Sequence, residues 1–293
     1  MREALLLVAH GSRSGAGQED MRQLAALVAT LPALSGVDVE LGYLELSQPP
    51  AGISLDRLVE RGAEHVVVLP LMLFAAGHSK SDVPAVVIEG RARHPGVALT
   101  YGRPFGVDHA LLEIARGRIE AVGGRGLPLA LVARGTSDPD ANAEACKVAR
   151  LLAEATGAPM VIVGFSGVTW PTVPDALDQL ERLGARGIVA FSWFLATGVL
   201  LERIGQQLAE VAERTGATVH DAGYLGPCAE LAALVLERYR EARSHDVRMN
   251  CDTCSYRKPF PGHEDRVGQA LGVGHSHLAA EHRTGSSARH HHH

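Results

Sequence analysis

The sequence predicts an α/β protein made of two similar halves, each with a central parallel sheet flanked by helices. Short apolar segments alternate with helix-like segments of about a dozen residues, which is the pattern of βαβ units. The same order of segments returns after about 120 residues, so one unit occurs twice in the 293-residue chain. Hydrophobic residues make up 46% of the chain and aromatic residues only 4%, which suits a core of Ala, Val and Leu between helices and a parallel sheet.

Each element of the first half is predicted from its hydrophobic pattern. The opening apolar run and "HVVVLPLML" are short and continuous, as expected of strands that are buried on both faces. "QEDMRQLAALVA" has an acidic first turn and apolar residues three and four positions apart, which predicts a helix. The first half is expected to contain strands at 5–9, 37–44, 65–73 and 97–102 and helices at 18–29, 53–61, 83–94 and 108–121.

The second half repeats this pattern with changed side chains. "LALVARGTS" matches "LLLVAHGSR", and the later segments follow in the same order. We therefore expect a first lobe over residues 1–122, a second lobe over 128–243 and a joint near 122–127. Residues 244–283 form a tail that contains cysteines and histidines, and 284–293 have the character of an expression tag.

Charge and composition exclude several classes of function. The net charge is −5 with both signs interspersed, so nothing predicts nucleic-acid binding. No apolar stretch reaches the roughly 18 residues of a membrane span, and the apolar start of the chain is too short for a signal peptide. We expect a cytoplasmic protein that has no membrane partner. Four cysteines in a chain of this size do not predict a disulfide framework.

Three polar side chains follow apolar strands of the first half: His10, Glu45 and His78, the last of them in a glycine-flanked loop. The carboxyl ends of parallel strands meet at one edge of a sheet, where α/β proteins bind ligands. Two imidazoles and a carboxylate suit a divalent metal of borderline softness, and three protein ligands leave coordination positions open. The sequence therefore predicts a site for a metal in transit, or for a metal that activates water.

The second half provides an internal comparison for these three residues. It has Arg134 at the position of His10, Gly167 at that of Glu45 and Val199 at that of His78. The unit folds in both versions, so the three polar side chains are not needed for folding. We infer that they serve chemistry and that only the first half performs it.

A phosphoryl-transfer role for His10 is the alternative that "HGSR" suggests. Such a site needs a cluster of arginines around the phosphate, and the strand-end loops of the first half supply only Arg13. The glycine-rich segment "GSRSGAG" lacks the Lys-Ser/Thr of a P-loop. The metal site is therefore the better interpretation.

The segments "LLLVAHGSR", "YLELSQP" and "LPLMLFAAGHSKSDVP" resemble the signature segments of the sirohydrochlorin chelatases, class II chelatases that insert cobalt or iron into a tetrapyrrole. The second half resembles a degenerate copy. The resemblance implies two chelatase-like lobes that face each other across a cleft for the macrocycle. It also implies that His10 and His78 bind the incoming metal and act on the pyrrole protons while Glu45 assists, so that Co²⁺ is a substrate of the protein.

Sirohydrochlorin carries many carboxylates, so the resemblance implies cationic or hydrogen-bonding groups around the cleft. The candidates are Ser12, Arg13, Lys80 and Arg134, with the backbone N–H groups of the loops after His10 and His78. A solvated surface charge is the alternative for each of the charged side chains.

The tail contains Met249-x-Cys251-x-x-Cys254 followed by scattered histidines. The longer cobaltochelatases of this family are similar here, with an M-x-C-x-x-C motif linked to an iron–sulfur cluster. Two thiolates are half of the usual ligand set. The others would come from a second subunit, giving a homodimer through the cluster, or from Cys146 and Cys228. The alternatives are a zinc half-site, a redox pair or exposed thiols in the tail, and burial inside helices for Cys146 and Cys228.

Together these features predict a lyase, a sirohydrochlorin cobaltochelatase of cobalamin biosynthesis that needs no ATP. The long form with its M-x-C-x-x-C tail favours cobalt over iron. A siroheme-pathway ferrochelatase with the same site is the enzymatic alternative. A metal-binding or metal-delivery protein that acts through its tail is the alternative from another class.

Overall fold

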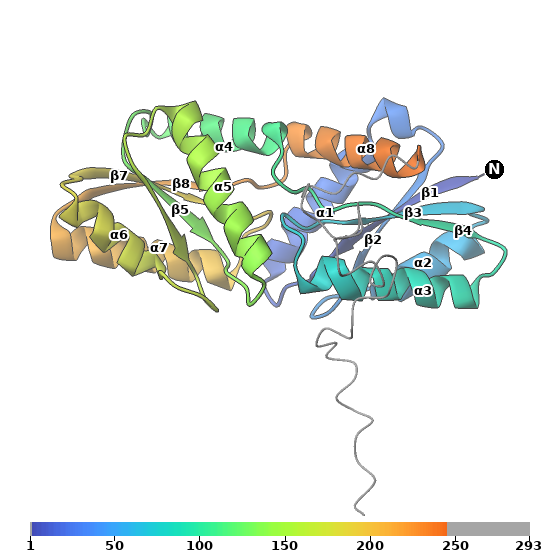
Figure 1. Cartoon of the computed structure of the whole chain (residues 1–293). Helices are drawn as coiled ribbons and strands as arrows, with labels where there is room; N and C mark the ends of the chain where they lie inside the picture. The colour runs from blue at the N-terminus through green and yellow to red at the C-terminus, as the bar shows by residue number, and fades with distance from the viewer. Residues whose placement is uncertain (1, 245–293) are drawn as a thin grey trace, which may run out of the picture.

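Two four-stranded parallel sheets form the centres of two lobes that lie end to end in an elongated molecule (Figure 1). The computed structural model describes residues 2–244 of the chain. The strands of the first sheet are β1 (Glu3–Ala9), β2 (Asp38–Tyr43), β3 (His65–Pro70) and β4 (Ala98–Tyr101). Those of the second sheet are β5 (Leu129–Ala133), β6 (Val161–Phe165), β7 (Gly187–Ser192) and β8 (Thr218–Tyr224).

The two sheets share one topology. Their strand orders are β2-β1-β3-β4 and β6-β5-β7-β8, and every pairing is parallel. The helices that connect them are α1 (Gly15–Ala29), α2 (Ala51–Glu60), α3 (Val83–Arg93), α4 (His109–Ala121), α5 (Pro139–Thr156), α6 (Val173–Arg182), α7 (Val199–Thr215) and α8 (Ala229–Arg243). A 3₁₀ turn, η1 (Pro32–Leu34), and a π-helix, η2 (His78–Asp82), complete the first lobe. The predicted class, two similar α/β lobes, is confirmed.

The apolar run that opens the sequence becomes the central strand β1, which is buried on both faces. Leu5 and Leu7 face a core that extends through both lobes, whereas Leu6 and Val8 face a smaller core beneath α2 and α3. Strands covered by helices on both sides need no polar face, which is why this run shows no alternation. The predicted elements occur with ends shifted by a few residues, except that His78 begins a π-helix instead of standing in a loop.

The last helix of each repeat packs against the sheet of the other lobe. Helix α4, which ends the first repeat, contacts α5, β7 and β8, and α8, which ends the second, contacts α1, β3 and β4. Figure 1 shows both helices along the same side of the molecule. The predicted lobe limits of 1–122 and 128–243 therefore describe the repeat in the sequence, while in space the two lobes exchange a helix.

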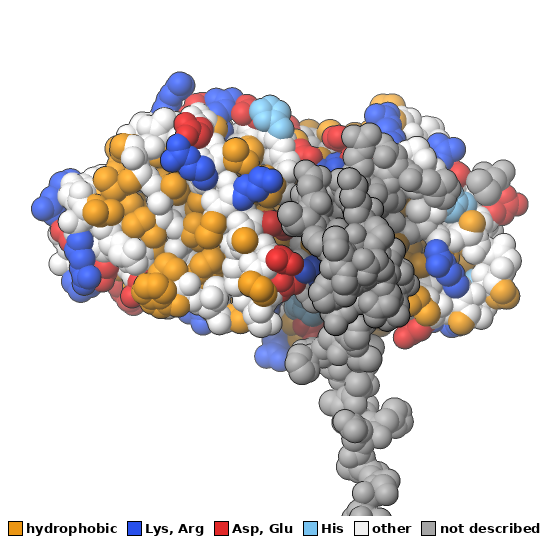
Figure 2. Space-filling view, viewed as in Figure 1, with side chains coloured by type: hydrophobic (Ala, Val, Ile, Leu, Met, Phe, Trp, Pro, Cys, Tyr) orange, Lys and Arg blue, Asp and Glu red, His pale blue; other side chains and the backbone are white. Residues whose placement is uncertain are grey.

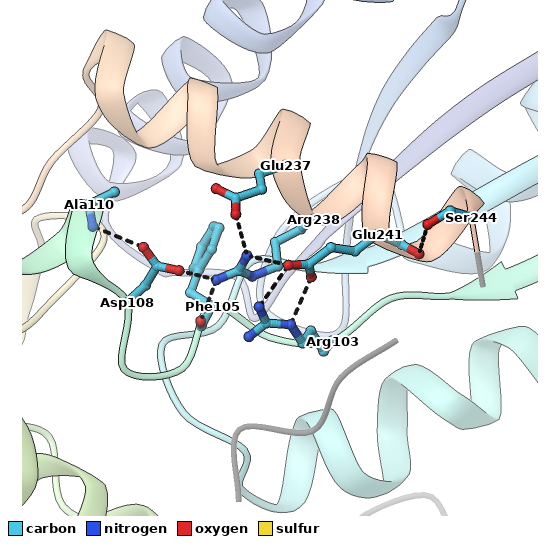
Figure 3. A network of polar contacts seen from close by, with 8 residues as sticks. All are labelled: Arg103, Phe105, Asp108, Ala110, Glu237, Arg238, Glu241 and Ser244. Carbon is cyan, nitrogen blue, oxygen red and sulfur yellow. Dashed lines mark hydrogen bonds and ion pairs between the residues drawn. The ribbon is translucent and has the colours of Figure 1, made fainter. Parts of the chain in front are cut away.

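A network of polar contacts fastens the exchanged helix α8 to the segment before α4 (Figure 3). Arg238, whose side chain is 1% exposed, donates to the carboxylate of Asp108 and to the carbonyl of Phe105. Arg103 donates to both oxygens of Glu241, each at 2.8 Å. Removing the partner of a buried guanidinium strongly destabilises a protein. These ion pairs therefore hold α8 in its position.

The surface of the molecule is unevenly polar. Hydrophobic side chains gather on the face of the second lobe that carries α5 and α6, with charged side chains mostly around them (Figure 2). The large exposed hydrophobic residues of this lobe are Leu151, Val168, Trp170, Leu183 and Val199. Within residues 2–244, no helix combines the length and the apolar character needed to cross a bilayer.

Candidate metal centre

The three predicted ligands come together at the carboxyl edge of the first sheet. His10 directly follows β1, Glu45 follows β2 by two residues, and His78 opens η2 after β3. One ligand atom from each lies within 4.8 Å of the other two. Three adjacent parallel strands deliver them to the same edge, as the sequence pattern predicts.

The loops that hold His10 and Glu45 approach each other as closely as backbone allows. Gly11 has φ +104°, and a Cβ placed on it would lie 1.7 Å from the carbonyl oxygen of Glu45. The backbone N–H of Glu45 donates to the carbonyl of His10 at 3.0 Å. Ser12 and Ser47 bond each other as well, since the Ser12 N–H donates to the Ser47 hydroxyl at 2.9 Å and this hydroxyl donates back to the Ser12 carbonyl at 3.0 Å. The separation of His10 from Glu45 is thus fixed by backbone.

The protonation state of His10 follows from its neighbours. Its Nδ1 lies 3.2 Å from the carbonyl of Gly11 and its Nε2 lies 3.1 Å from Oε1 of Glu45, and both of these oxygens can only accept. Burial lowers the pKa of His10, and His78 and Arg134 lower it further, against the opposing effects of the Gly11 carbonyl and Glu45. The net result is a pKa below the ordinary value of 6.5, so His10 is neutral at pH 7.

A neutral His10 has one N–H for two acceptor contacts, the Gly11 carbonyl and Oε1 of Glu45. The ring nitrogen that carries no proton keeps a lone pair that can bind a cation. The ring of His78 stands edge-on to that of His10, with centroids 4.4 Å apart and an interplanar angle of 86°. The donor set is therefore arranged for a cation that several groups share.

The cluster is accessible from outside. The side chains of His10, His78 and Glu45 are 31%, 30% and 45% exposed. A cavity of about 130 Å³ beside His10 is lined by residues of both lobes, including Ser12 and Met21 of the first and Leu195 and Ala196 of the second.

The second lobe presents its own strand ends to this site. Asp20 of α1 accepts from the backbone N–H of Thr197 and from the hydroxyl of Tyr224, both at 2.8 Å. Gly17 lies so close to the Thr197 carbonyl that a Cβ on it would stand 2.5 Å away. The carboxyl edges of the two sheets therefore face each other, with the metal-site candidates on one side and the second lobe's replacements on the other.

The residues predicted to bind substrate carboxylates have different surroundings. Lys80 pairs with Asp138 at 2.6 Å and with Asp140 at 3.6 Å. Burial lowers the pKa of Lys80, but these two carboxylates outweigh it and the net pKa is raised. Ser12 holds the loop together, as described above. Arg13 and Arg134 are exposed and form no salt bridge with any residue in the described part of the chain. Their role toward substrate stays a prediction.

Asp82 is a neighbour of the site that was not predicted from the sequence. Its Oδ2 lies 2.6 Å from Nδ1 of His78, four residues earlier in the π-helix. The signal was present as a carboxylate one turn after a candidate ligand, but a carboxylate near the start of a helix is also what the helix dipole favours.

Two of the four cysteines, Cys146 and Cys228, lie in the described part of the chain. Cys251 and Cys254 lie outside the described residues. Cys228 stands at the start of α8, where burial raises the pKa of its thiol. Cys146 of α5 is exposed, so the expectation of burial is wrong for this residue.

Comparison with known proteins places the chain in a family. The family model CbiX matches twice, over residues 4–122 and 128–242. A sirohydrochlorin cobaltochelatase of Priestia megaterium is 35% identical over 90% of this chain and 87% of its own length. A sirohydrochlorin ferrochelatase of Bacillus subtilis is 30% identical over 87% of this chain and 98% of its own length. The solved structure of SirB from Bacillus subtilis with Fe³⁺ superposes with a TM-score of 0.74 at 29% identity, covering 84% of this chain and 97% of that one. The chain belongs to the CbiX family, and its two lobes have the fold of the chelatase SirB.

Proposed function

We propose that the chain is a sirohydrochlorin cobaltochelatase, a lyase-class enzyme that inserts Co²⁺ into the macrocycle without ATP. The observation that carries the proposal is the cluster of His10, Glu45 and His78, in which Nε2 of His10 lies 3.1 Å from a carboxylate oxygen of Glu45 and one ligand atom of each residue lies within 4.8 Å of the other two. This arrangement calls for a cation. The relatives named above act on sirohydrochlorin, which identifies the second substrate.

The proposed reaction exchanges two protons for one metal ion. Two pyrrole N–H bonds break, the two protons leave the macrocycle, and the metal ion binds its four ring nitrogens. His10, His78 and Glu45 hold the ion before transfer. As the ion leaves, the lone pairs that it occupied become free to accept the pyrrole protons. A neutral imidazole is a suitable acceptor near pH 7.

Cobalt is the metal that we propose for the natural reaction. The cobaltochelatase relative is 35% identical and the ferrochelatase relative 30%. The M-x-C-x-x-C tail of the long form adds to this preference. The tail cluster, the homodimer through it and the cytoplasmic location remain predictions of the sequence. Ser12, Arg13 and Arg134 are proposed to receive the substrate carboxylates, with Lys80 doing so if it leaves Asp138.

An anaerobic absorption assay tests the function. Purified protein is mixed with sirohydrochlorin and Co²⁺, Fe²⁺ or Ni²⁺, and the change of the macrocycle spectrum is followed in time. We expect the largest rate enhancement over the uncatalysed reaction with Co²⁺. A larger enhancement with Fe²⁺ would identify a ferrochelatase instead.

A chain that ends at Arg248 separates insertion from metal delivery. It lacks Cys251 and Cys254 but keeps the described lobes. A chelatase retains insertion activity after this deletion. A protein that acts through its tail loses its function.

A further inference from the structure

The two histidines of the metal centre are held by different acceptors. Nδ1 of His10 meets a backbone carbonyl at 3.2 Å, whereas Nδ1 of His78 meets the Asp82 carboxylate at 2.6 Å. We propose that Asp82 is a positioning residue that fixes the ring of His78 with Nε2 free for the metal and strengthens it as a ligand. The inference rests on the proposed function, because it concerns the same metal centre.

The contact between Asp82 and His78 joins a carboxylate to a ring nitrogen of an imidazole. A carboxylate only accepts, so the proton of a neutral His78 sits on Nδ1 and Nε2 keeps its lone pair. A carboxylate on the far nitrogen of a ligating imidazole fixes the ring orientation and raises its basicity as a ligand. The contact between Asp82 and His78 is therefore of the kind that supports a metal ligand from behind.

The backbone that carries His78 and Asp82 has an unusual conformation. His78 to Asp82 form a π-helix, and α3 follows as an ordinary helix. Short π-helical turns are rare and are frequently found at functional sites. The hydroxyl of Tyr101 donates to the Ser79 carbonyl at 2.5 Å, which ties the turn to the end of β4. The π-helical turn is thus attached to the edge of the sheet, and it carries both His78 and Asp82.

The second lobe contains neither member of the His78–Asp82 pair. Counting from Gly77 and its counterpart Gly198, Val199 takes the position of His78 and Arg203 that of Asp82. There the chain enters a regular α-helix directly at Val199. Arg203 donates instead to the Ser166 carbonyl at 3.1 Å. Histidine, carboxylate and π-turn are present together in one lobe and absent together from the other.

Among the described residues, Asp82 forms an ion pair with His78 only. A second His–Asp contact in the same lobe joins His94 to Asp56 at 2.7 Å, but Asp56 also pairs with Arg93 at 3.1 Å. Within residues 2–244, Asp82 forms no salt bridge with a lysine or arginine, and its other contact is the hydroxyl of Ser81 at 3.4 Å. The charge of Asp82 is directed to His78 alone.

Co²⁺ alone, titrated into the full-length protein without tetrapyrrole, tests this inference. The variants are Asp82→Ala and the isosteric Asp82→Asn, with Asp56→Asn as the matched control because it alters a His–Asp contact away from the site. His78→Ala measures the Co²⁺ bound by the tail and the terminal histidines, and this background is subtracted. Binding is followed by calorimetry and by the visible absorption of the bound Co²⁺.

We expect Asp82→Ala to weaken the His78-dependent Co²⁺ binding by about 10- to 100-fold and to change its absorption spectrum, with a smaller effect for Asp82→Asn. In the insertion assay the KM for Co²⁺ should rise more than kcat falls. Asp56→Asn should leave binding, spectrum and KM unchanged.

Wild-type affinity and spectrum in Asp82→Ala would overturn the positioning role while leaving the proposed function intact. If Asp82→Ala does not fold, Asp82→Leu takes its place, because leucine cannot accept from Nδ1 of His78, and wild-type binding by this folded variant has the same meaning. A different failure, in which His78→Ala binds Co²⁺ and inserts it like the wild type, would overturn the proposed metal centre itself.

Discussion

Gly11 and Glu45 are packed so closely that a single methyl group on Gly11 would overlap the Glu45 carbonyl, at 1.7 Å. The second lobe repeats this contact between Gly135 and Gly167, where the corresponding distance is 2.2 Å. The contact is therefore part of the fold in both lobes, and in the first lobe it also fixes how far His10 lies from Glu45.

Gly11→Ala should destabilise the protein by at least about 2 kcal/mol, because a positive φ and a backbone overlap are both unfavourable for alanine. Urea unfolding followed by circular dichroism measures the change. Gly15→Ala is the control, since a Cβ at Gly15 meets nothing within 4 Å. Equal stability of the two variants would contradict the account of the loop contact.

His10→Arg should fold and yet lose insertion activity by about 10²-fold or more. The fold tolerates the change because β5 runs into the same turn with Arg134. We expect the Tm to stay within about 2 °C of the wild type, which corresponds to about 1 kcal/mol in a protein of this size. His109→Ala, an exposed residue of α4, is the matched control and should keep full activity. Near-normal insertion by His10→Arg would remove His10 from the mechanism.

The lowered pKa of His10 predicts a midpoint below 6.5 in an NMR titration of the metal-free protein. Arg134→Gln removes a charge that lowers this pKa, so the midpoint should move upward. The unfolded chain titrates near ~6.5 and takes up the proton first. The stability that neutral His10 contributes is therefore present above pH ~6.5 and is lost as the pH falls from there through the lower folded pKa. A midpoint above 6.5 in the wild type would be the contrary result.

Arg238→Met should cost about 3–5 kcal/mol of stability, because it leaves the carboxylate of Asp108 without its buried ion-pair partner, whereas Glu241 keeps Arg103. Chemical denaturation gives the value. Arg150→Met provides the comparison, since the ion pair of Arg150 with Glu154 is exposed and should contribute less than about 1 kcal/mol. Similar losses in the two variants would mean that α8 is held by apolar packing alone.

The sequence allowed the two sheets and the clustering of His10, Glu45 and His78 to be predicted, because each depends on local order. A buried parallel strand is a continuous apolar run, and the residue after it must lie at the sheet edge. The helix exchange could not be predicted, because the apolar faces of α4 and α8 fit a sheet without specifying which one. Asp82 escaped notice because a π-turn has no distinct hydrophobic period, so nothing in "GHSKSD" indicates that the carboxylate turns back to the histidine.

The exchange of α4 and α8 has a consequence for the ancestry of the chain. A protein with one repeat alone would have a terminal helix with no place on its own sheet, and two such proteins would bury both helices by trading them. Fusion through residues 122–127 then joins partners that already depend on each other. Once they are one polypeptide, the two lobes are free to differ at matching positions, as His10 and Arg134 do, while each continues to supply the helix that its neighbour requires.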